Sequence, residues 1–519
     1  MVFSSIPFVY FFLPLCLAAY FLAPFKFKNG VLLIFSLVFY AWGEPVYILL
    51  MLLVSFSDYC IGRLMEGFGR KKIFLLLSVF IDLGVLGFFK YADFVMDSLN
   101  AAVRLISPQA EGLLSILHGP HIALPIGISF FTFQSMSYIF DLYKGDVECE
   151  KSYIDYITYI SMFPQLIAGP IVRYATVHEE LHNRKISRDD ISAGAKRFAM
   201  GLFKKVLIAN QVGQLFDQVS AAAVNASAAA AVGVSSSAAS AAAVAASTAA
   251  NMGMAATGTG IGTGVSAAAA WLGAAAFTLQ LYFDFSAYSD MAIGIGRILG
   301  FHFNENFDHP LSAVSVTDFW RRWHISLSTW FRDYVYIPLG GNRHGAANQI
   351  RNMLIVWFLT GLWHGASWNF VFWGLWHFSF LILEKHVLGR LLDKLPYKLP
   401  YVLRHIYALA IVIIGFTIFA ITDITELSVF FRCMFANTQI AGSDFFFYMR
   451  NYGAVFALAF VLAFPVYDKL SEFVKVKLHS DVSGIGFRLA SSAAYALLFI
   501  ITTAYLVADT YNPFLYFRF

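Results

Sequence analysis

Apolar runs of the length that a lipid bilayer requires recur along this chain from its first residues to its last. A helix needs about 17–25 predominantly apolar residues to cross the hydrocarbon core, because each residue adds only about 1.5 Å to its length. Of the 519 residues, 59% are hydrophobic and 13% are charged, whereas soluble domains carry about 25% charged residues. The sequence therefore predicts an all-α integral membrane protein that crosses the bilayer several times, and it excludes a soluble globular fold.

The charged residues help to orient this predicted bundle. The formal net charge is +4 and no long run of Lys or Arg occurs, so we expect no nucleic-acid partner. Short basic clusters at Lys26, Lys28 and residues 70–72 indicate loops on the cytoplasmic side. The four cysteines are scattered without a CxxC pair, so we expect neither a disulfide framework nor a zinc site. They are Cys16, Cys60, Cys149 and Cys433.

We interpret residues 1–519 as one membrane domain with roughly 11–13 hydrophobic segments, and two of its segments are unusual. Residues 153–174 are apolar but contain Pro164, Gly169 and Pro170. This pattern indicates either a re-entrant or broken helix, which must be buried in protein or line a cavity, or an ordinary span with a kink. Residues 220–270 are an Ala/Ser/Gly-rich segment without charged or aromatic residues. They predict either alanine-rich helices or a low-complexity insertion.

Residues 318–376 form the stretch in which we expect the chemistry. The stretch opens with Asp-Phe-Trp-Arg-Arg-Trp-His at residues 318–324, which is too polar to span a membrane. We therefore predict interfacial helices and turns over residues 318–342, anchored by tryptophans and arginines. An apolar run follows and carries His364 within Leu-Trp-His-Gly. An ionisable side chain inside such a run is expensive and points to a functional site.

The two histidines of this stretch each allow more than one interpretation. A neutral imidazole at membrane depth is suited to act as a general base, but His364 could equally hydrogen-bond between helices. His377 has no polar neighbours in the sequence and we assign it to packing. Close to His324, Arg321 and Arg322 with Trp320 and Trp323 could bind a phosphate-bearing cofactor or touch anionic lipid headgroups. We expect no metal site, because ligand-spaced carboxylates are missing near the two histidines.

Several motifs together resemble the membrane-bound O-acyltransferases of the bacterial branch that acetylates cell-surface polysaccharides. The Trp-Arg-Arg-Trp-His-Ile-Ser-Leu-Ser motif of residues 320–328 and Gly-Leu-Trp-His-Gly of residues 361–365 are specific to that family. Further resembling segments are Met-Val-Phe-Ser-Ser at residues 1–5, Leu-Pro-Ile-Gly-Ile-Ser-Phe-Phe at 124–131, Phe-Pro-Gln-Leu-Ile-Ala-Gly-Pro at 163–170 and Leu-Tyr-Phe-Asp-Phe-Ser at 281–286. The resemblance covers nearly the whole chain, and residues 220–270 depart from it.

The resemblance implies a bundle of transmembrane helices with re-entrant segments, in which funnels from both sides meet at a histidine that corresponds to His364. It implies catalytic roles for His364, as the base that deprotonates the acceptor hydroxyl, and for His324, which polarises the thioester carbonyl or orients the acyl chain. We expect the donor or the substrate to be bound by Asp318, Trp320, Arg321, Arg322, Trp323, Ser328, Trp363 and Gln165. No bound cofactor is expected, and acetyl-CoA is the expected acyl donor.

The resemblance also implies a place and partners for the protein. The acetyl group would enter from the cytoplasm, cross the bacterial inner membrane and reach a hydroxyl outside. An extracytoplasmic acetyltransferase or acceptor protein would then pass it to the polysaccharide. Two alternatives stay open. One is transfer of D-alanine from a carrier protein to teichoic acid, and the other is a non-enzymatic transporter of polysaccharide precursors, against which the missing inverted repeat argues.

Overall fold

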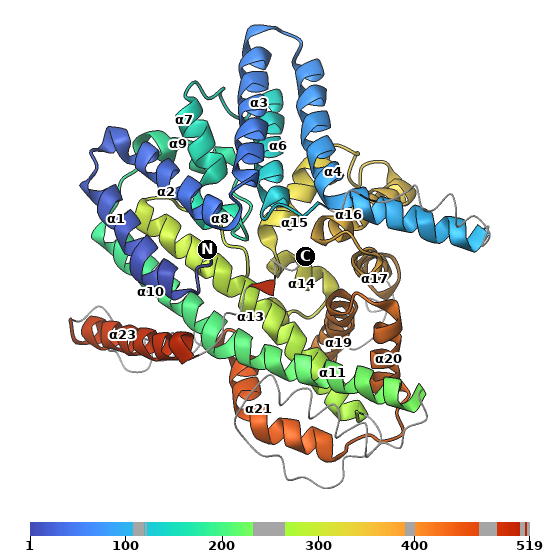
Figure 1. Ribbon diagram of the computed structural model, residues 1–519. Helices are drawn as coiled ribbons and strands as arrows, with labels where there is room; N and C mark the ends of the chain where they lie inside the picture. The colour runs from blue at the N-terminus through green and yellow to red at the C-terminus, as the bar shows by residue number, and fades with distance from the viewer. Residues whose placement is uncertain are drawn as a thin grey trace.

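The computed structural model describes residues 1–106, 119, 122–231, 265–389, 400–466, 485–508 and 514–515 (Figure 1). All regular secondary structure in these ranges is helical, which confirms the prediction of an all-α protein. The segment predicted over residues 220–270 is described only at its ends. Residues 220–231 continue a helix and residues 267–270 begin another, whereas residues 232–264 lie outside the described part.

The first half of the chain forms a series of helices, with short 3₁₀ or π segments labelled η. They are η1 (Phe8–Phe12), α1 (Leu13–Leu22), η2 (Phe25–Phe27), α2 (Lys28–Gly43), α3 (Tyr47–Gly67), α4 (Lys71–Ile106), α6 (Ile128–Lys144), α7 (Tyr153–Ser161), α8 (Phe163–Leu166), α9 (Tyr174–Asn183), α10 (Arg188–Phe203), η3 (Lys204–Ala209) and α11 (Asn210–Ala231).

The second half contains the stretch in which we predicted the chemistry. Its helices are α13 (Ala267–Leu299), η4 (Pro310–Ser312), α14 (Val316–Arg322), α15 (Ile325–Phe331), η5 (Arg332–Tyr336), α16 (Gly345–His364), α17 (Trp368–Leu383), η6 (Glu384–Leu388), α19 (Tyr401–Ala420), α20 (Ile424–Phe435), α21 (Ser443–Leu462) and α23 (Ile485–Ala508). The run of short helices and turns from α14 to η5 agrees with the helices and turns predicted for residues 318–342, and their interfacial position stays a prediction.

Five of the described helical segments are long and apolar enough to cross a membrane. They are Phe25–Gly43, Tyr47–Gly67, Lys71–Arg104, Tyr401–Ala420 and Ser443–Leu462. Large apolar side chains project outward from these helices, as Leu53 (68% exposed) and Phe80 (77% exposed) illustrate. In water such exposure would be costly, whereas lipid tails accommodate it. The described spans therefore support a multi-pass membrane protein, and the larger number of segments expected from the sequence stays a prediction.

The apolar segment of residues 153–174 is a broken helix. Helix α7 ends at Ser161, α8 contains only four residues, and the chain then stays non-helical until α9 begins at Tyr174. Side chains from Met162 to Ile171 are buried in the protein. The non-helical backbone is thus covered by protein, as an irregular segment in a membrane protein must be. The broken-helix interpretation is confirmed, and an uninterrupted kinked span is wrong.

Buried apolar side chains form two large cores that meet near the middle of the molecule. We call them the N-terminal core, built mainly from the first 203 residues, and the C-terminal core, built mainly from residues 208–463. Helix α13 contributes to both and runs alongside α10 and α11 (Figure 1). The predicted chemical stretch also belongs to both cores. Trp323 and Trp373 lie in the C-terminal core, whereas Leu327 and Trp363 lie in the N-terminal core. Each of the two motif histidines therefore occupies the boundary between the cores.

Candidate active site

His324 occupies a tight turn between α14 and α15. Its backbone is left-handed, with φ of 45° and ψ of 53°, a conformation that is uncommon for a residue with a Cβ atom. The turn is held from the neighbouring loop, because the amide of Ile325 donates to the carbonyl of Asn306 at 3.0 Å and the amide of Asp308 donates to the carbonyl of Arg322 at 3.0 Å. The His324 side chain is completely buried. Such a constrained backbone at a buried polar residue is common at functional sites.

Asn306 orients the His324 ring, and sequence reasoning missed it. The Asn306 Oδ1 atom accepts from the Ser326 amide at 3.2 Å and from the Ser326 hydroxyl at 2.9 Å, which identifies it as the carbonyl oxygen. His324 Nδ1 lies 3.2 Å from the same atom. Because that oxygen can only accept, Nδ1 carries the proton and Nε2 is the basic nitrogen. A loop asparagine 18 positions before the histidine gives no sequence signal for this contact.

His364 is the last residue of α16. Gly365 after it is extended and starts the short connection to α17. The His364 ring is buried among aromatic rings, with centroid distances of 5.0 Å to Trp363, 4.8 Å to Trp373 and 5.3 Å to Phe419. The fourth neighbour is His324, whose ring centroid lies 6.5 Å away. The fold therefore brings together the two histidines that the sequence singled out, one in the turn before α15 and the other at the end of α16.

Close contact between α16 and α17 sets the position of His364. A Cβ atom at Gly361 would lie 2.4 Å from the carbonyl oxygen of Phe370, and one at Gly374 would lie 2.4 Å from that of Trp357. Any side chain at these two positions would push the helices apart. Small residues at helix interfaces let membrane helices approach closely. This contact fixes the end of α16 on which His364 stands.

Helix α4 holds the same helix end from the other side. Lys90 donates to the carbonyl of Trp363 and, at 3.1 Å, to the hydroxyl of Ser129, and Tyr91 donates to the carbonyl of Leu362 at 2.7 Å. The last carbonyls of a helix have no partner within the helix and need one elsewhere. Sequence reasoning did not single out Lys90, so its contact with the site was missed. Only the buried position of Lys90 shows this role.

The polar residues predicted to bind the donor have mostly local partners. Asp318 accepts from Arg322 at 2.9 Å and from the amide of Val314 at 3.3 Å, so it stabilises the start of α14. Arg321 is exposed, and the Ser328 amide donates to the carbonyl of His324 at 3.1 Å. Of this set, Arg321 is the residue whose side chain is best placed to meet a soluble ligand.

The three tryptophans predicted to bind the donor, Trp320, Trp323 and Trp363, are buried and pack against other aromatic rings. Trp320 packs against Trp357 at 4.6 Å, and Trp323 against Phe416 at 5.0 Å. Trp363 lies closer to the chemistry, because its ring centroid is 5.7 Å from that of His324. The sequence pattern does not distinguish these positions, since all three have a basic or histidine neighbour. In this arrangement Trp363 contacts both histidines, whereas Trp320 and Trp323 shape the surrounding core.

Gln165 lies in the buried helix α8 and is fully buried. Its amide nitrogen donates to the carbonyl of Tyr159, which closes the break between α7 and α8. The same broken segment also contacts the turn that carries His324. The amide of Ile171 donates to the Ser326 hydroxyl at 3.0 Å, and Ser326 is bonded to Asn306. The predicted re-entrant segment thus supports the turn that carries His324.

The arrangement is suited to proton transfer. Burial lowers the pKa of His324 to about 3, so this imidazole is neutral near pH 7. Two imidazoles side by side among aromatic rings can accept a proton and polarise a carbonyl.

Among the described residues, a group that could hold a metal ion occurs elsewhere, at Glu150, His178 and His182, whose ligand atoms lie within 4.8 Å of one another. Glu150 already accepts from His182 at 3.0 Å and from Tyr174 at 2.6 Å, and these hydrogen bonds account for the group.

The family model described as MBOAT, membrane-bound O-acyltransferase family, matches residues 265–425, which include both histidines. Over the whole length of both chains, the sequence is 37% identical to the probable alginate O-acetylase of Pseudomonas putida. The chain belongs to the membrane-bound O-acyltransferase family.

Two further relatives of this membrane-bound O-acyltransferase carry different names. It is 31% identical to the peptidoglycan O-acetyltransferase of Helicobacter pylori, over 73% of this chain and 69% of that protein. It is 26% identical to the teichoic acid D-alanyltransferase of Bacillus subtilis, over 50% of this chain and 59% of that protein. The protein is therefore an acyltransferase enzyme of the membrane, as the motifs predicted, and a purely transporting role is no longer needed to explain it.

Proposed function

We propose that this enzyme moves an acetyl group from acetyl-CoA on the cytoplasmic side of the bacterial inner membrane to a hydroxyl on the opposite side. The acceptor hydroxyl would serve the O-acetylation of a cell-surface polysaccharide, in line with the alginate and peptidoglycan named for its relatives. An extracytoplasmic acetyltransferase or acceptor protein is the expected partner. The observation that carries the proposal is the buried pair of His364 and His324 at the boundary between the two cores.

In this mechanism His364 takes the proton of the acceptor hydroxyl as its oxygen attacks the thioester carbonyl carbon. A tetrahedral intermediate forms, its carbon–sulfur bond breaks, and the departing thiolate takes the proton back from His364. His324 polarises the thioester carbonyl or orients the acyl group, with Asn306 holding its ring in place. The aromatic walls exclude water, which would otherwise hydrolyse the thioester and weaken every electrostatic contact in the site.

The competing function is D-alanyl transfer from a carrier protein to teichoic acid, the activity named for the Bacillus subtilis relative. It uses the same class of chemistry with a different donor. The higher identity and complete coverage of the alginate O-acetylase relative favour acetyl transfer. The two functions differ in which thioester is consumed, and this is directly measurable.

Sealed vesicles with the cytoplasmic face outward provide the test. Acetyl-labelled CoA is supplied outside and label is followed into acceptor inside, with the wild-type enzyme, with His364→Ala, and with the accessory acceptor protein present. We expect label to cross only with the wild type. Equal transfer by both proteins would move the base away from His364. Absence of transfer, together with consumption of a D-alanyl carrier protein, would overturn the acetyl-CoA assignment.

A further inference from the structure

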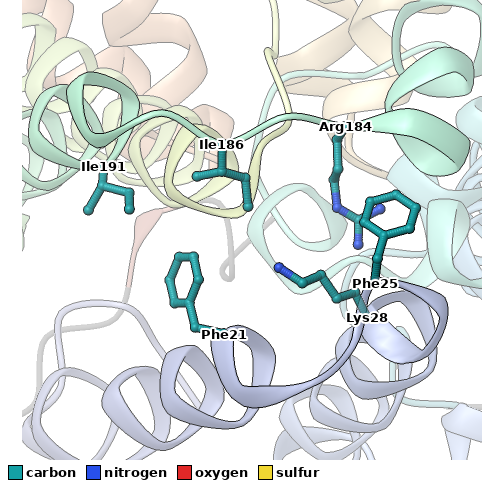
Figure 2. Close-up of a pocket in the computed structure, with 6 residues that line it drawn as sticks. All are labelled: Phe21, Phe25, Lys28, Arg184, Ile186 and Ile191. Carbon is teal, nitrogen blue, oxygen red and sulfur yellow. The ribbon is translucent and has the colours of Figure 1, made fainter.

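A cavity of about 360 Å³ lies away from the histidines, between the end of α1 with the start of α2 and the connection from α9 to α10 (Figure 2). Two cations and four apolar side chains line it. They are Phe21, Phe25, Lys28, Arg184, Ile186 and Ile191. Figure 2 shows the Lys28 amino group and the Arg184 guanidinium near each other, with Phe21 and Phe25 on either side. The cavity is therefore cationic at one part of its wall and apolar over the rest.

The Arg184 side chain is held in one position by hydrogen bonds within the protein. Its side chain is 94% buried, since 6% of its surface is exposed. The Nε atom donates to the hydroxyl of Tyr20 at 2.5 Å, and Nη1 donates to Asn29 Oδ1 at 2.7 Å. The Nη2 atom has no hydrogen-bond acceptor in the described part of the chain. A buried donor of a charged group without an acceptor costs free energy, and an anion placed beside it would remove that cost.

Lys28 adds a second charge to the same place. Its Nζ atom lies 4.7 Å from the centroid of the Tyr20 ring, and Arg184 Cζ lies 5.4 Å from the same centroid. Neither cation forms an ion pair with a carboxylate in the described residues. Two acids on adjoining helices bond to other residues, because Asp155 accepts from Asn29 at 2.6 Å and Glu180 from His302 at 2.7 Å. Two like charges that share a wall without a counterion favour a bound anion.

The surroundings of the cavity indicate which anion fits. The lining residues Phe21 and Phe25 belong to a segment rich in exposed apolar side chains at the end of α1 and in η2, among them Leu22 (84% exposed) and Phe27 (60% exposed). Phe21 and Phe25 in the wall are themselves 41% and 48% exposed. A small hydrophilic anion would leave these rings uncovered, whereas a phospholipid would place its phosphate on the cations and its acyl chains on the rings. Basic pockets between membrane helices are recognised sites for anionic headgroups.

We propose that this cavity binds the phosphate group of an anionic membrane phospholipid, with Lys28 and Arg184 as the cationic contacts and Phe21 and Phe25 against the acyl chains. Bound lipid would join α1 and α2 to the connection between α9 and α10. Arg184 already links these parts, through Tyr20, whose hydroxyl donates to the carbonyl of Leu299 at 2.6 Å. The site is separate from acyl transfer and does not depend on the proposed function.

Native mass spectrometry of the purified enzyme tests the site. Phosphatidylglycerol is titrated against diacylglycerol with the same acyl chains, for the wild type, Lys28→Glu and Lys26→Glu. Lys28 is chosen for substitution because its side chain makes no hydrogen bond to any other described residue, whereas Arg184 has structural partners whose loss could unfold the protein. Lys26 is the matched control, since it is an exposed lysine two positions earlier that does not line the cavity.

We expect the wild type and Lys26→Glu to retain phosphatidylglycerol equally and to release diacylglycerol. Lys28→Glu should bind phosphatidylglycerol roughly 30-fold more weakly, because it removes one attractive charge and adds a repulsive one. Equal loss in the two variants, or equal retention, would overturn the proposal. Displacement of the lipid by inorganic phosphate or by acetyl-CoA at the same phosphate concentration would also overturn it, by assigning the cavity to a soluble phosphate ligand.

Discussion

Two buried histidines of the second half have closely similar aromatic surroundings and differ in everything else. His364 packs against Trp373 at 4.8 Å, and His377 packs against the same tryptophan at 5.3 Å. Trp320 and Trp357 complete the surroundings of His377, with centroids 5.0 and 5.8 Å away. Counting buried aromatic neighbours would therefore assign the two histidines the same role.

The polar environment separates them. His364 stands at a helix end, beside a second histidine that Asn306 orients. His377 lies in the middle of α17, and neither of its ring nitrogens has a hydrogen-bond partner in the described residues. His364 also lies at the boundary between the two cores, whereas the neighbours of His377 belong to the C-terminal core. Burial alone therefore does not mark a histidine as a candidate base, and the polar group beside it, here a second histidine held by Asn306, separates His364 from His377.

Replacing each of the two histidines is the most direct test of whether His364 and His377 have different roles. His364→Ala should lower acetyl transfer by about 10²- to 10⁴-fold, the usual contribution of a general base. His377→Phe keeps an aromatic ring in the same cage and should leave the activity per folded molecule close to that of the wild type. Initial rates of both variants, normalised to folded protein by size-exclusion chromatography, decide the matter. Comparable losses of activity in the two variants would show that acetyl transfer depends on the packing of the aromatic rings and not on a base at His364.

Removing the group that orients His324 should have the next largest effect. Asn306→Ala should lower kcat by about 10²-fold with little change in KM, because a catalytic group displaced by about 1 Å loses that much. In the double variant His324→Ala/Asn306→Ala, the loss should be no greater than in His324→Ala alone, since the two residues act as one unit.

Asn352→Ala is the matched control for the loss of a buried amide. Asn352 donates only to the carbonyls of Leu339 and Gly341, so its replacement should lower thermal stability without the selective loss of kcat. Additive losses in the Asn306 and His324 double variant would contradict the positioning role.

Substitution at the contact between α16 and α17 should lower activity less than the changes at His364 and Asn306. Gly361→Ala places a Cβ atom 2.4 Å from a backbone oxygen, so it should cost about 1–3 kcal/mol of stability. The displacement of α16 should also lower activity about tenfold. In α4, a Cβ atom at Gly84 would meet no side chain or neighbouring helix within 4 Å, so Gly84→Ala should be neutral or stabilise by up to about 1 kcal/mol. Thermal unfolding in detergent measures the stability of the two variants. Equal stability of Gly361→Ala and Gly84→Ala would refute the close contact.

The smallest expected effect on catalysis comes from Lys90 of α4, which bonds to the end of α16. Lys90→Met leaves the buried Trp363 carbonyl without its donor and should cost about 1–3 kcal/mol of stability. Acetyl transfer should fall only modestly, because Lys90 supports the backbone next to His364 and does not touch its ring. Lys72→Met, at an exposed position of the same helix, is the control. Unchanged melting temperatures in both variants would show that the Lys90 contact does not stabilise the site.

The sequence by itself determined the class of the protein, the stretch that carries its chemistry and the pair of histidines. Each of these depends on a local pattern. Apolar runs are recognised by length, a charged or titratable residue inside such a run is conspicuous, and the Trp-His-Gly and Trp-Arg-Arg-Trp-His motifs are contiguous in the chain. The broken helix of residues 153–174 was predictable for the same reason, because its prolines and glycine lie within a few positions of one another.

Only the tertiary structure decided how the site is assembled. Lys90 contacts Trp363 across 273 positions of sequence, and Asn306 reaches His324 from a loop that carries no motif. Trp320 and Trp363 have similar neighbours in sequence, yet one encloses His377 and the other touches both site histidines. Such contacts depend on how two hydrophobic cores pack against each other. Packing is a property of side chains distant in the chain, and no local pattern of residues encodes it.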